Sequence, residues 1–215
     1  MNRSRLLGGL ALAAAGTAFF AGQLVVQSAW TTSFSWADNN ISDLGMVSCR
    51  TWGDPARYVC SPWHAVMNAV FVANGVLIGI GAVFGLRGGG RGRVARYLLL
   101  AAAIGCCLVG IAPADVDENL HVLGAALVFL LGNVGMIAAW SVTRGPRWLP
   151  VLFGVVGLVA TGLHLSKHGL GLGVAGMERL AVFPLFVWFL VEGALIVRAA
   201  RRRIPSERAD AAGVA

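Results

Sequence analysis

The chain alternates long apolar runs with short polar connections. Six of these runs are roughly 20 residues long, which is enough for a helix to cross a bilayer core of about 30 Å. The pattern predicts an all-α fold, a polytopic membrane bundle of six transmembrane helices. We expect the spans near residues 6–28, 64–86, 94–112, 121–142, 148–166 and 180–199.

The composition is typical of this class. Mean hydropathy is +0.74, and only 13% of the residues are charged, which is about half the share found in soluble domains. Because little of the chain lies outside the spans, we expect one transmembrane domain over residues 1–203 and a polar cytoplasmic tail at 204–215.

Basic residues predict the orientation, because Lys and Arg beside the spans are retained in the cytoplasm. Thirteen of the 17 basic residues fall on the side of the two termini. We therefore predict a multi-pass protein of the cell membrane with both termini cytoplasmic. The isoelectric point of about 10.3 reflects arginine clusters beside apolar spans, so we expect lipid and no nucleic acid as the partner. The four basic residues on the outer side are Arg50, Arg57, Lys167 and Arg179.

The longest connection, about residues 29–63, follows the first span and is expected to form an outer lid. It contains Cys49 and Cys60 on the side where thiols are oxidised, so we predict a disulfide between them. Asn40 and Asp43 stand in a stretch rich in residues that cap helices and turns. Two interpretations are open for these residues: a cap on a short surface helix, or polar contacts to a substrate.

Every histidine and seven of the ten acidic residues fall on the predicted outer side. Asp117 and His121 are four residues apart, so within one helix the carboxylate would lie beside the imidazole and orient it. His164 and His168 repeat this spacing at the end of the fifth span. Such groups are candidates for acid–base catalysis. The candidate catalytic residues are His64, Asp115, Asp117, His121, His164 and His168.

A zinc ion is one hypothesis for the same residues. His64, His164 and His168 would supply three ligands, and Asp115 or Asp117 would hold a water molecule in the fourth position. A metal-free acid–base site and a solvated surface are the alternatives.

Other polar residues are candidates for substrate binding. Glu178 and Arg179 are adjacent, just before the sixth span, and cannot share a helical face. Arg179 would either pair with an outer carboxylate and tie the loops together or hold an anionic substrate group. Glu192, near the middle of the sixth span, is expected to be protonated, paired or part of a proton relay. The candidate binding residues are Asn40, Asp43, Asn68, Glu178 and Arg179.

Four motifs resemble a known family. They are Asn40–Gly45, Cys60–Asn68, Gly110–Asp115 with the downstream His121, and Gly173–Arg179. The set extends over nearly the whole chain and resembles the bacterial and archaeal membrane proteins of domain-of-unknown-function family 998. This resemblance implies six membrane helices, motifs gathered at the outer surface, and no agreed activity.

A looser similarity is to the membrane hydrolases that include alkaline ceramidases and adiponectin receptors, which use a Ser, an Asp and three His. It implies these roles for His64, Asp115, His164 and His168. That group has seven core spans, and in this chain Ser61 stands three rather than four residues before His64.

Two functions from different classes follow from this pattern. The first is an intramembrane enzyme that acts on a lipid or isoprenoid-type hydrophobic substrate, by hydrolysis or by acid-initiated cyclisation. The second is a non-catalytic membrane protein, either a small-molecule transporter or an envelope factor, whose polar cluster is structural. No inverted repeat or interrupted pair of spans is visible, which disfavours a transporter.

Overall fold

The computed structural model describes residues 3–86 and 88–202 and confirms the six-helix prediction. Six helices in this part of the chain are long and apolar enough to cross a membrane, and each overlaps an expected span. They are α1 (Arg3–Ser28), α2 (His64–Phe84), α3 (Arg91–Ile111), a composite fourth span (Glu118–Ser141), α6 (Trp148–Leu165) and α7 (Val174–Arg202).

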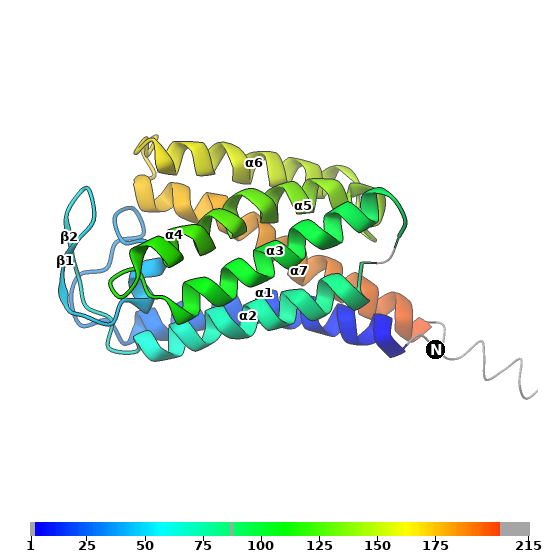
Figure 1. The fold of residues 1–215 in the computed structure, drawn as a ribbon, viewed down its shortest axis with the longest axis horizontal. Helices are drawn as coiled ribbons and strands as arrows, with labels where there is room; N and C mark the ends of the chain where they lie inside the picture. Colours follow the sequence, from blue (N-terminus) through cyan, green and yellow to red (C-terminus); the bar gives the residue numbers. More distant parts are fainter. Residues whose placement is uncertain (1–2, 87, 203–215) are drawn as a thin grey trace, which may run out of the picture.

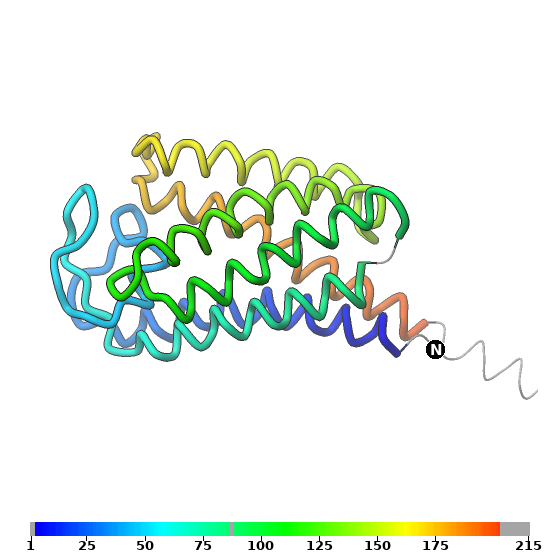
Figure 2. The backbone as a smooth tube through the Cα atoms, viewed as in Figure 1, coloured from blue at the N-terminus to red at the C-terminus, as the bar shows by residue number. Residues whose placement is uncertain are grey.

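The spans form a closed ring in sequence order (Figure 1). Each span packs along the next one in the chain, and α7 returns to pack along α1. The start of α1 and the end of α7 lie at one end of the bundle, while the connection between α1 and α2 covers the opposite end (Figure 2). The two ends of the bundle therefore differ sharply in the amount of chain outside the helices.

Close contact between neighbouring spans depends on glycine. A Cβ atom added to Gly8 of α1 would lie 2.1 Å from the backbone nitrogen of Gly85, which follows α2. A Cβ atom on Gly105 of α3 would lie 2.5 Å from the carbonyl oxygen of Gly124 in the fourth span. Side chains do not fit at these positions. Small residues at helix interfaces are expected in lipid, where association gains little hydrophobic energy and depends on close packing.

The fourth span changes its helical form along its length. It begins as α4 (Glu118–Ala126), widens into a π-helical segment, η2 (Leu127–Gly132), and continues as α5 (Asn133–Ala138) and a 3₁₀ turn, η3 (Ala139–Ser141). α4 packs on α3, whereas α5 packs on both α3 and α6. Residues of α4 and α6 consequently face each other across a cavity instead of touching along a seam. Single π-helical turns of this kind are frequent at functional sites.

Residues 29–63, called the lid below, form a folded cap between α1 and α2. A 3₁₀ turn, η1 (Ser42–Gly45), precedes an antiparallel hairpin of β1 (Arg50–Trp52) and β2 (Arg57–Val59). The two lid cysteines form the predicted disulfide at the base of this hairpin. The lid is therefore a cross-linked unit and not an extended loop.

The sixth span begins earlier than the sequence predicts. Glu178 and Arg179 lie inside α7, near its start, instead of in the turn before it. Both side chains are buried. The end of an apolar run predicts the end of a span, but here groups of the lid form hydrogen bonds with both charged side chains and the helix includes them.

Candidate functional site

The end of the bundle that the lid covers, called the lid end below, contains a cavity of about 930 Å³. The cavity lies between the lid, α4, α6 and the start of α7. His121 of α4, His164 of α6 and Glu178 of α7 all line it. Polar residues that are far apart in the chain therefore meet where α4 separates from α6. We call this space the lid cavity.

His121 is buried, with 7% of its surface exposed. Its Nδ1 lies 2.9 Å from the carbonyl oxygen of Ala112. Because a carbonyl group only accepts hydrogen bonds, Nδ1 carries the proton and Nε2 keeps a free lone pair. Within residues 3–86 and 88–202, Nε2 has no hydrogen-bond partner. In the neutral ring, Nε2 of His121 is therefore the nitrogen that is able to accept a proton.

His164, in the last turn of α6, is held in the same way. Its Nδ1 lies 2.9 Å from the carbonyl oxygen of Val174, the first residue of α7. Phe129 of the π-helical segment packs edge-on against the imidazole, with 6.2 Å between the ring centroids. The ring is thus fixed by two other elements, and its Nε2 is again the nitrogen with the free lone pair.

Glu178 is the third polar group of the lid cavity, and it is 5% exposed. Its Oε2 accepts a hydrogen bond from the backbone nitrogen of Ile41 at 2.6 Å, which ties the lid to α7. The carboxylate also interacts electrostatically with His164 and Arg179. In the described part of the chain, no group donates to Oε1. A buried carboxylate beside an imidazole is an arrangement that proton-transfer sites use.

A second cavity of about 40 Å³ lies deeper in the bundle. Its walls include the rings of Phe19, Phe71 and Phe186. His121 and Glu178 line both cavities. These two side chains therefore line both a large space of mixed polarity under the lid and a small apolar recess, a combination that suits a ligand with polar and non-polar parts.

Asp43 is a structural residue of the lid. Its buried carboxylate accepts hydrogen bonds from Nε and Nη2 of Arg57 at 2.6 and 2.5 Å. The backbone nitrogen of Asn40 donates to the same carboxylate at 3.0 Å. A forked ion pair with a third donor satisfies a buried charge well. Of the two residues considered for substrate contact, Asn40 lines the lid cavity and Asp43 does not.

Arg179 holds the lid through backbone oxygens. Its Nη1 donates to the carbonyl groups of Trp36 and Asn39 at 3.0 and 2.7 Å. Its guanidinium carbon lies 5.1 Å from the ring centroid of Trp36, a cation–π contact. Among the described residues, Arg179 forms no salt bridge with Asp43, Asp115 or Asp117. The expected pairing with an outer carboxylate is thus replaced by carbonyl contacts, while the neighbouring Glu178 balances the charge.

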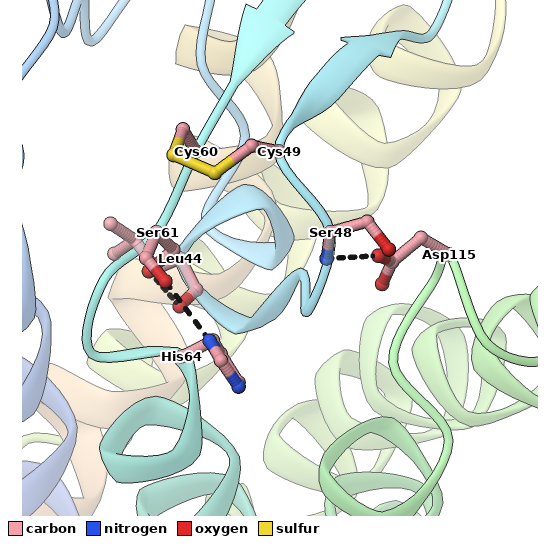
Figure 3. Close-up of a disulfide and its surroundings, with 7 residues drawn as sticks. All are labelled: Leu44, Ser48, Cys49, Cys60, Ser61, His64 and Asp115. Carbon is pink, nitrogen blue, oxygen red and sulfur yellow. Dashed lines mark hydrogen bonds between the residues drawn. A yellow bond between two sulfur atoms is a disulfide. The ribbon is translucent and has the colours of Figure 1, made fainter.

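Asp115 anchors another part of the lid (Figure 3). Its two carboxylate oxygens accept hydrogen bonds from the backbone nitrogens of Val47 and Ser48 at 3.1 and 2.7 Å. Figure 3 shows the bond from Ser48. These residues precede Cys49, whose disulfide with Cys60 closes the hairpin. Partial burial raises the pKa of Asp115, but the backbone hydrogen bonds outweigh it and hold the pKa below the ordinary value of 3.8. Asp115 is therefore an ionised acceptor at neutral pH.

Asp117 caps a helix instead of orienting a histidine. Its Oδ1 accepts a hydrogen bond from the backbone nitrogen of Leu120 at 3.0 Å, as the N-cap residue of α4. His121 turns to Ala112, so the predicted pair of Asp117 and His121 does not form. The spacing of four residues brings side chains together inside a helix, but α4 begins at Glu118 and leaves Asp117 outside it.

His64 and Asn68 support the lid from the first turns of α2. Nδ1 of His64 lies 3.0 Å from the carbonyl oxygen of Ser61 (Figure 3). Nδ2 of Asn68 donates to the carbonyl oxygen of Gly45 at 2.9 Å. Neither residue lines either cavity. Both side chains bind backbone at points where the lid meets the bundle.

The three histidines considered as zinc ligands are not gathered. His64 contacts the lid at the start of α2, His168 is exposed and bonds to Ser166 at 3.1 Å, and His164 lines the lid cavity. In the part of the chain that the structure describes, no three His, Cys, Asp or Glu side chains could share a metal ion. The residues present do not fit a zinc centre with three protein ligands.

Glu192 lies away from the lid, near the connection between the fourth span and α6. Its carboxylate accepts hydrogen bonds from Oγ1 of Thr143 at 2.6 Å and from the backbone nitrogen of Arg144 at 2.7 Å. Of the roles expected for this residue, the structure supports pairing. Several donors on one carboxylate explain how a glutamate is accommodated in a membrane span.

Several polar residues that line the lid cavity were not among the site candidates of the sequence analysis, Ser42 and Thr161 among them. Ser42 lines both cavities, and Thr161 lines the lid cavity one turn before His164. Each had a signal in the sequence, since Ser42 lies in the motif Asn40–Gly45 and Thr161 is three residues before a candidate histidine.

Comparison with known proteins gives a family match. Residues 10–195 match the family model DUF998, described as a protein of unknown function. No curated protein and no solved structure matches the chain. The looser similarity to ceramidases is not supported, because the residues to which it assigns roles are dispersed: His64 and Asp115 hold the lid, and His168 is exposed.

Proposed function

The chain belongs to the DUF998 family of proteins of unknown function, and from this premise we propose a membrane-embedded enzyme that performs acid–base chemistry on a lipid-like substrate. One observation carries the proposal. His121 and His164 both have Nδ1 fixed by a backbone carbonyl group and both line one cavity with the buried Glu178. His64 makes the same kind of bond but lines neither cavity, so the shared cavity is what distinguishes His121 and His164.

Hydrolysis is the reaction that these groups support best. Nε2 of one histidine takes a proton from a water molecule as the water oxygen adds to the scissile carbon. The histidine then returns this proton to the leaving group, so that the two products share the atoms of one water molecule. General acid–base catalysis of this kind contributes about 10² to 10⁴ in rate. Glu178 stabilises the protonated imidazole of His164.

Acid-initiated cyclisation has less support. The candidate catalytic residues Asp115 and Asp117 both accept backbone hydrogen bonds as carboxylates, and neither lines the lid cavity. The proposed enzyme therefore uses histidine bases and not these aspartates.

The lid is proposed to face the outside of the cell membrane. The disulfide between Cys49 and Cys60 requires an oxidising compartment. Within residues 3–86 and 88–202, most basic residues belong to the opposite end of the bundle, where the start of α1 and the end of α7 meet. A hydrophobic substrate then reaches the lid cavity from the outer leaflet.

The test is conversion of lipid by purified protein in nanodiscs made from a bacterial polar lipid extract, followed by mass spectrometry. We expect time-dependent conversion of one lipid class, and a loss of at least about 100-fold in His121→Gln and His164→Gln. His168→Gln is the matched control, because His168 is exposed and does not line the cavity. No conversion by the wild-type protein, or equal rates in all variants, contradicts the proposal.

A non-catalytic envelope protein is the second candidate. It is favoured by the number of polar side chains that only hold the lid, such as Asp43, Asp115 and Arg179. In that case His121→Gln and His164→Gln would lower the thermal stability of the protein, and any effect on growth under envelope stress would follow the amount of folded protein.

A further inference from the structure

The lid cavity carries an excess of negative charge. Two cationic and four acidic side chains line it, which leaves two formal negative charges. The acidic residues are Asp38, Asp54, Glu118 and Glu178, and the cations are Arg57 and Lys167. The whole chain has the opposite sign, with a formal net charge of +7. The negative charge is therefore a local property of this end of the protein.

The cations of the lid cavity are poorly placed to hold an anion. Arg57 is already committed, because two of its nitrogens donate to the carboxylate of Asp43. Lys167 is exposed, in the turn that follows α6. Phosphate groups are usually bound by free guanidinium forks or clusters of cations. A phosphorylated head group would meet neither of these here, and it would face the four carboxylates.

Glu178 provides a place for a cation instead. The side chain is buried, and its Oε2 is used by the backbone of Ile41. Its Oε1 has no donor within the described residues, although the side chain lines both cavities. A buried carboxylate with an unused oxygen favours a donor that carries positive charge.

One wall of the lid cavity is apolar and faces outward. Val122 of α4 and Leu165 of α6 line the cavity and are 57% and 67% exposed. Ala126 and Leu130, further along the fourth span, continue this wall. In a membrane-spanning bundle, exposed apolar side chains face lipid. The space between α4 and α6 is therefore open to a hydrocarbon chain from the bilayer.

We infer that the lid cavity binds a long-chain amphiphile with a cationic amine head group. The amine lies at Glu178 and the chain passes between α4 and α6 into the membrane. This inference rests on the proposed function and names its substrate class: a lipid with an amine and not an anionic phosphate head group.

The first test compares three probes with the same chain, hexadecylamine, hexadecanol and hexadecyl phosphate, at equal mole fraction in a non-ionic detergent. Thermal unfolding of the purified full chain is the readout. We expect the amine to raise the melting temperature most and the phosphate least. An equal shift with all three probes, or the largest shift with hexadecyl phosphate, overturns the inference.

Charge variants test whether Glu178 and the rim carboxylates select the amine. We expect about tenfold weaker binding of hexadecylamine by Glu178→Gln, since one charged hydrogen bond is lost. Should that variant fold poorly, Asp38→Asn with Asp54→Asn changes two exposed lid residues and is expected to weaken binding about threefold at low salt. Lys167→Gln removes the opposite charge and should strengthen binding. If all of these variants change the affinity for hexadecylamine in the same direction, the charge of the lid cavity does not select the amine.

A bulky side chain tests the path of the alkyl chain. Ala126→Trp places an indole in the apolar wall between α4 and α6, and we expect at least a tenfold loss of hexadecylamine affinity. Val76→Trp is the matched control, because Val76 is exposed on α2 and lines neither cavity. Equal affinities of the two variants show that the chain does not pass between α4 and α6.

The experiments distinguish failure of the ligand proposal from failure of the enzyme proposal. If wild type and His121→Gln both bind hexadecylamine but convert no lipid, the ligand class stands and the enzyme proposal falls. If lipid is converted without preference for amine probes, the enzyme proposal stands and the ligand class is wrong.

Discussion

Polar side chains at the lid end differ in whether their hydrogen bonds leave a donor or acceptor atom free. Asp43 and Asp115 use both carboxylate oxygens for lid groups, and Arg179 uses its Nη1 for lid carbonyl groups. His121 and His164 line the cavity and use Nδ1 for a carbonyl group, while Nε2 has no hydrogen-bond partner among the described residues. The first kind of residue builds the lid, and the second kind is available for chemistry.

The capping role of Asp117 predicts an effect on stability alone. Asp117→Ala removes the acceptor for the backbone nitrogen of Leu120, and we expect a loss of about 1 kcal/mol in the free energy of unfolding. Asp117→Asn keeps an equally good cap and should be as stable as wild type. Chemical denaturation in detergent measures both. A severe loss of activity in a stable Asp117→Asn protein would show that the carboxylate has a second role.

The lowered pKa of Asp115 predicts acid sensitivity of the lid. Since folding depresses this pKa below 3.8, the carboxylate adds stability above the ordinary pKa, and this contribution is lost as pH falls below about 4 through the folded-state pKa. Hydrogen exchange at Val47 and Ser48 should accelerate in that range. In Asp115→Asn, exchange at these two amides should already be faster at neutral pH and should change less on acidification.

At the scale of the elements, the six spans could be predicted from the sequence, but the change of helical form within the fourth span could not. Apolar runs predicted six helices because a chain segment that crosses lipid must satisfy its backbone hydrogen bonds internally, as a helix does. The π-helical segment is made of Leu, Val and Phe, residues that fit an α-helix equally well, so its widening depends on neighbouring helices. The start of α7 was predicted too late for a related reason. Glu178 and Arg179 form hydrogen bonds with the lid, and the local sequence does not indicate these contacts.

The disulfide is predicted to act on the lid more than on the bundle. Replacing Cys49 and Cys60 by Ser frees a loop with a separation of 11 residues, for which loop-closure entropy amounts to about 2 to 3 kcal/mol. We expect faster trypsin cleavage after Arg50 and Arg57 in the double variant. The melting temperature of the helices should change little, because the spans pack without the hairpin. Unchanged cleavage rates would show that Asp115 and Arg57 hold the lid unaided.

At the scale of the whole molecule, the packing order of the helices in the ring determines which residues come together. The sequence placed four histidines at one end of the bundle, and the fold brings two of them to one cavity. His64 belongs to α2, on a different part of the ring from α4 and α6, so its distance from the other histidines follows from the packing order. That order is a tertiary property, and it could not be predicted from the spacing of residues in the chain.

The predicted orientation can be tested on intact cells. After replacement of the free Cys106 and Cys107 by Ala, Thr51→Cys in the lid should react with a membrane-impermeant maleimide. Arg147→Cys, in the connection before α6, should react only after lysis, because it lies on the side of the termini. The reverse pattern of labelling would invert the topology and place the lid in the cytoplasm.

Closure of the ring by its first and last helices sets an order for biosynthesis. Phe19 of α1 stacks on Phe186 of α7 with 3.7 Å between ring centroids, although α1 is synthesised before the other five spans and α7 after them. A nascent chain with five helices inserted has an open flank along α1 and lacks the carboxylate of Glu178. The lid cavity is therefore complete only after α7 has been made, and a shortened polypeptide that stops before α7 lacks one of its walls.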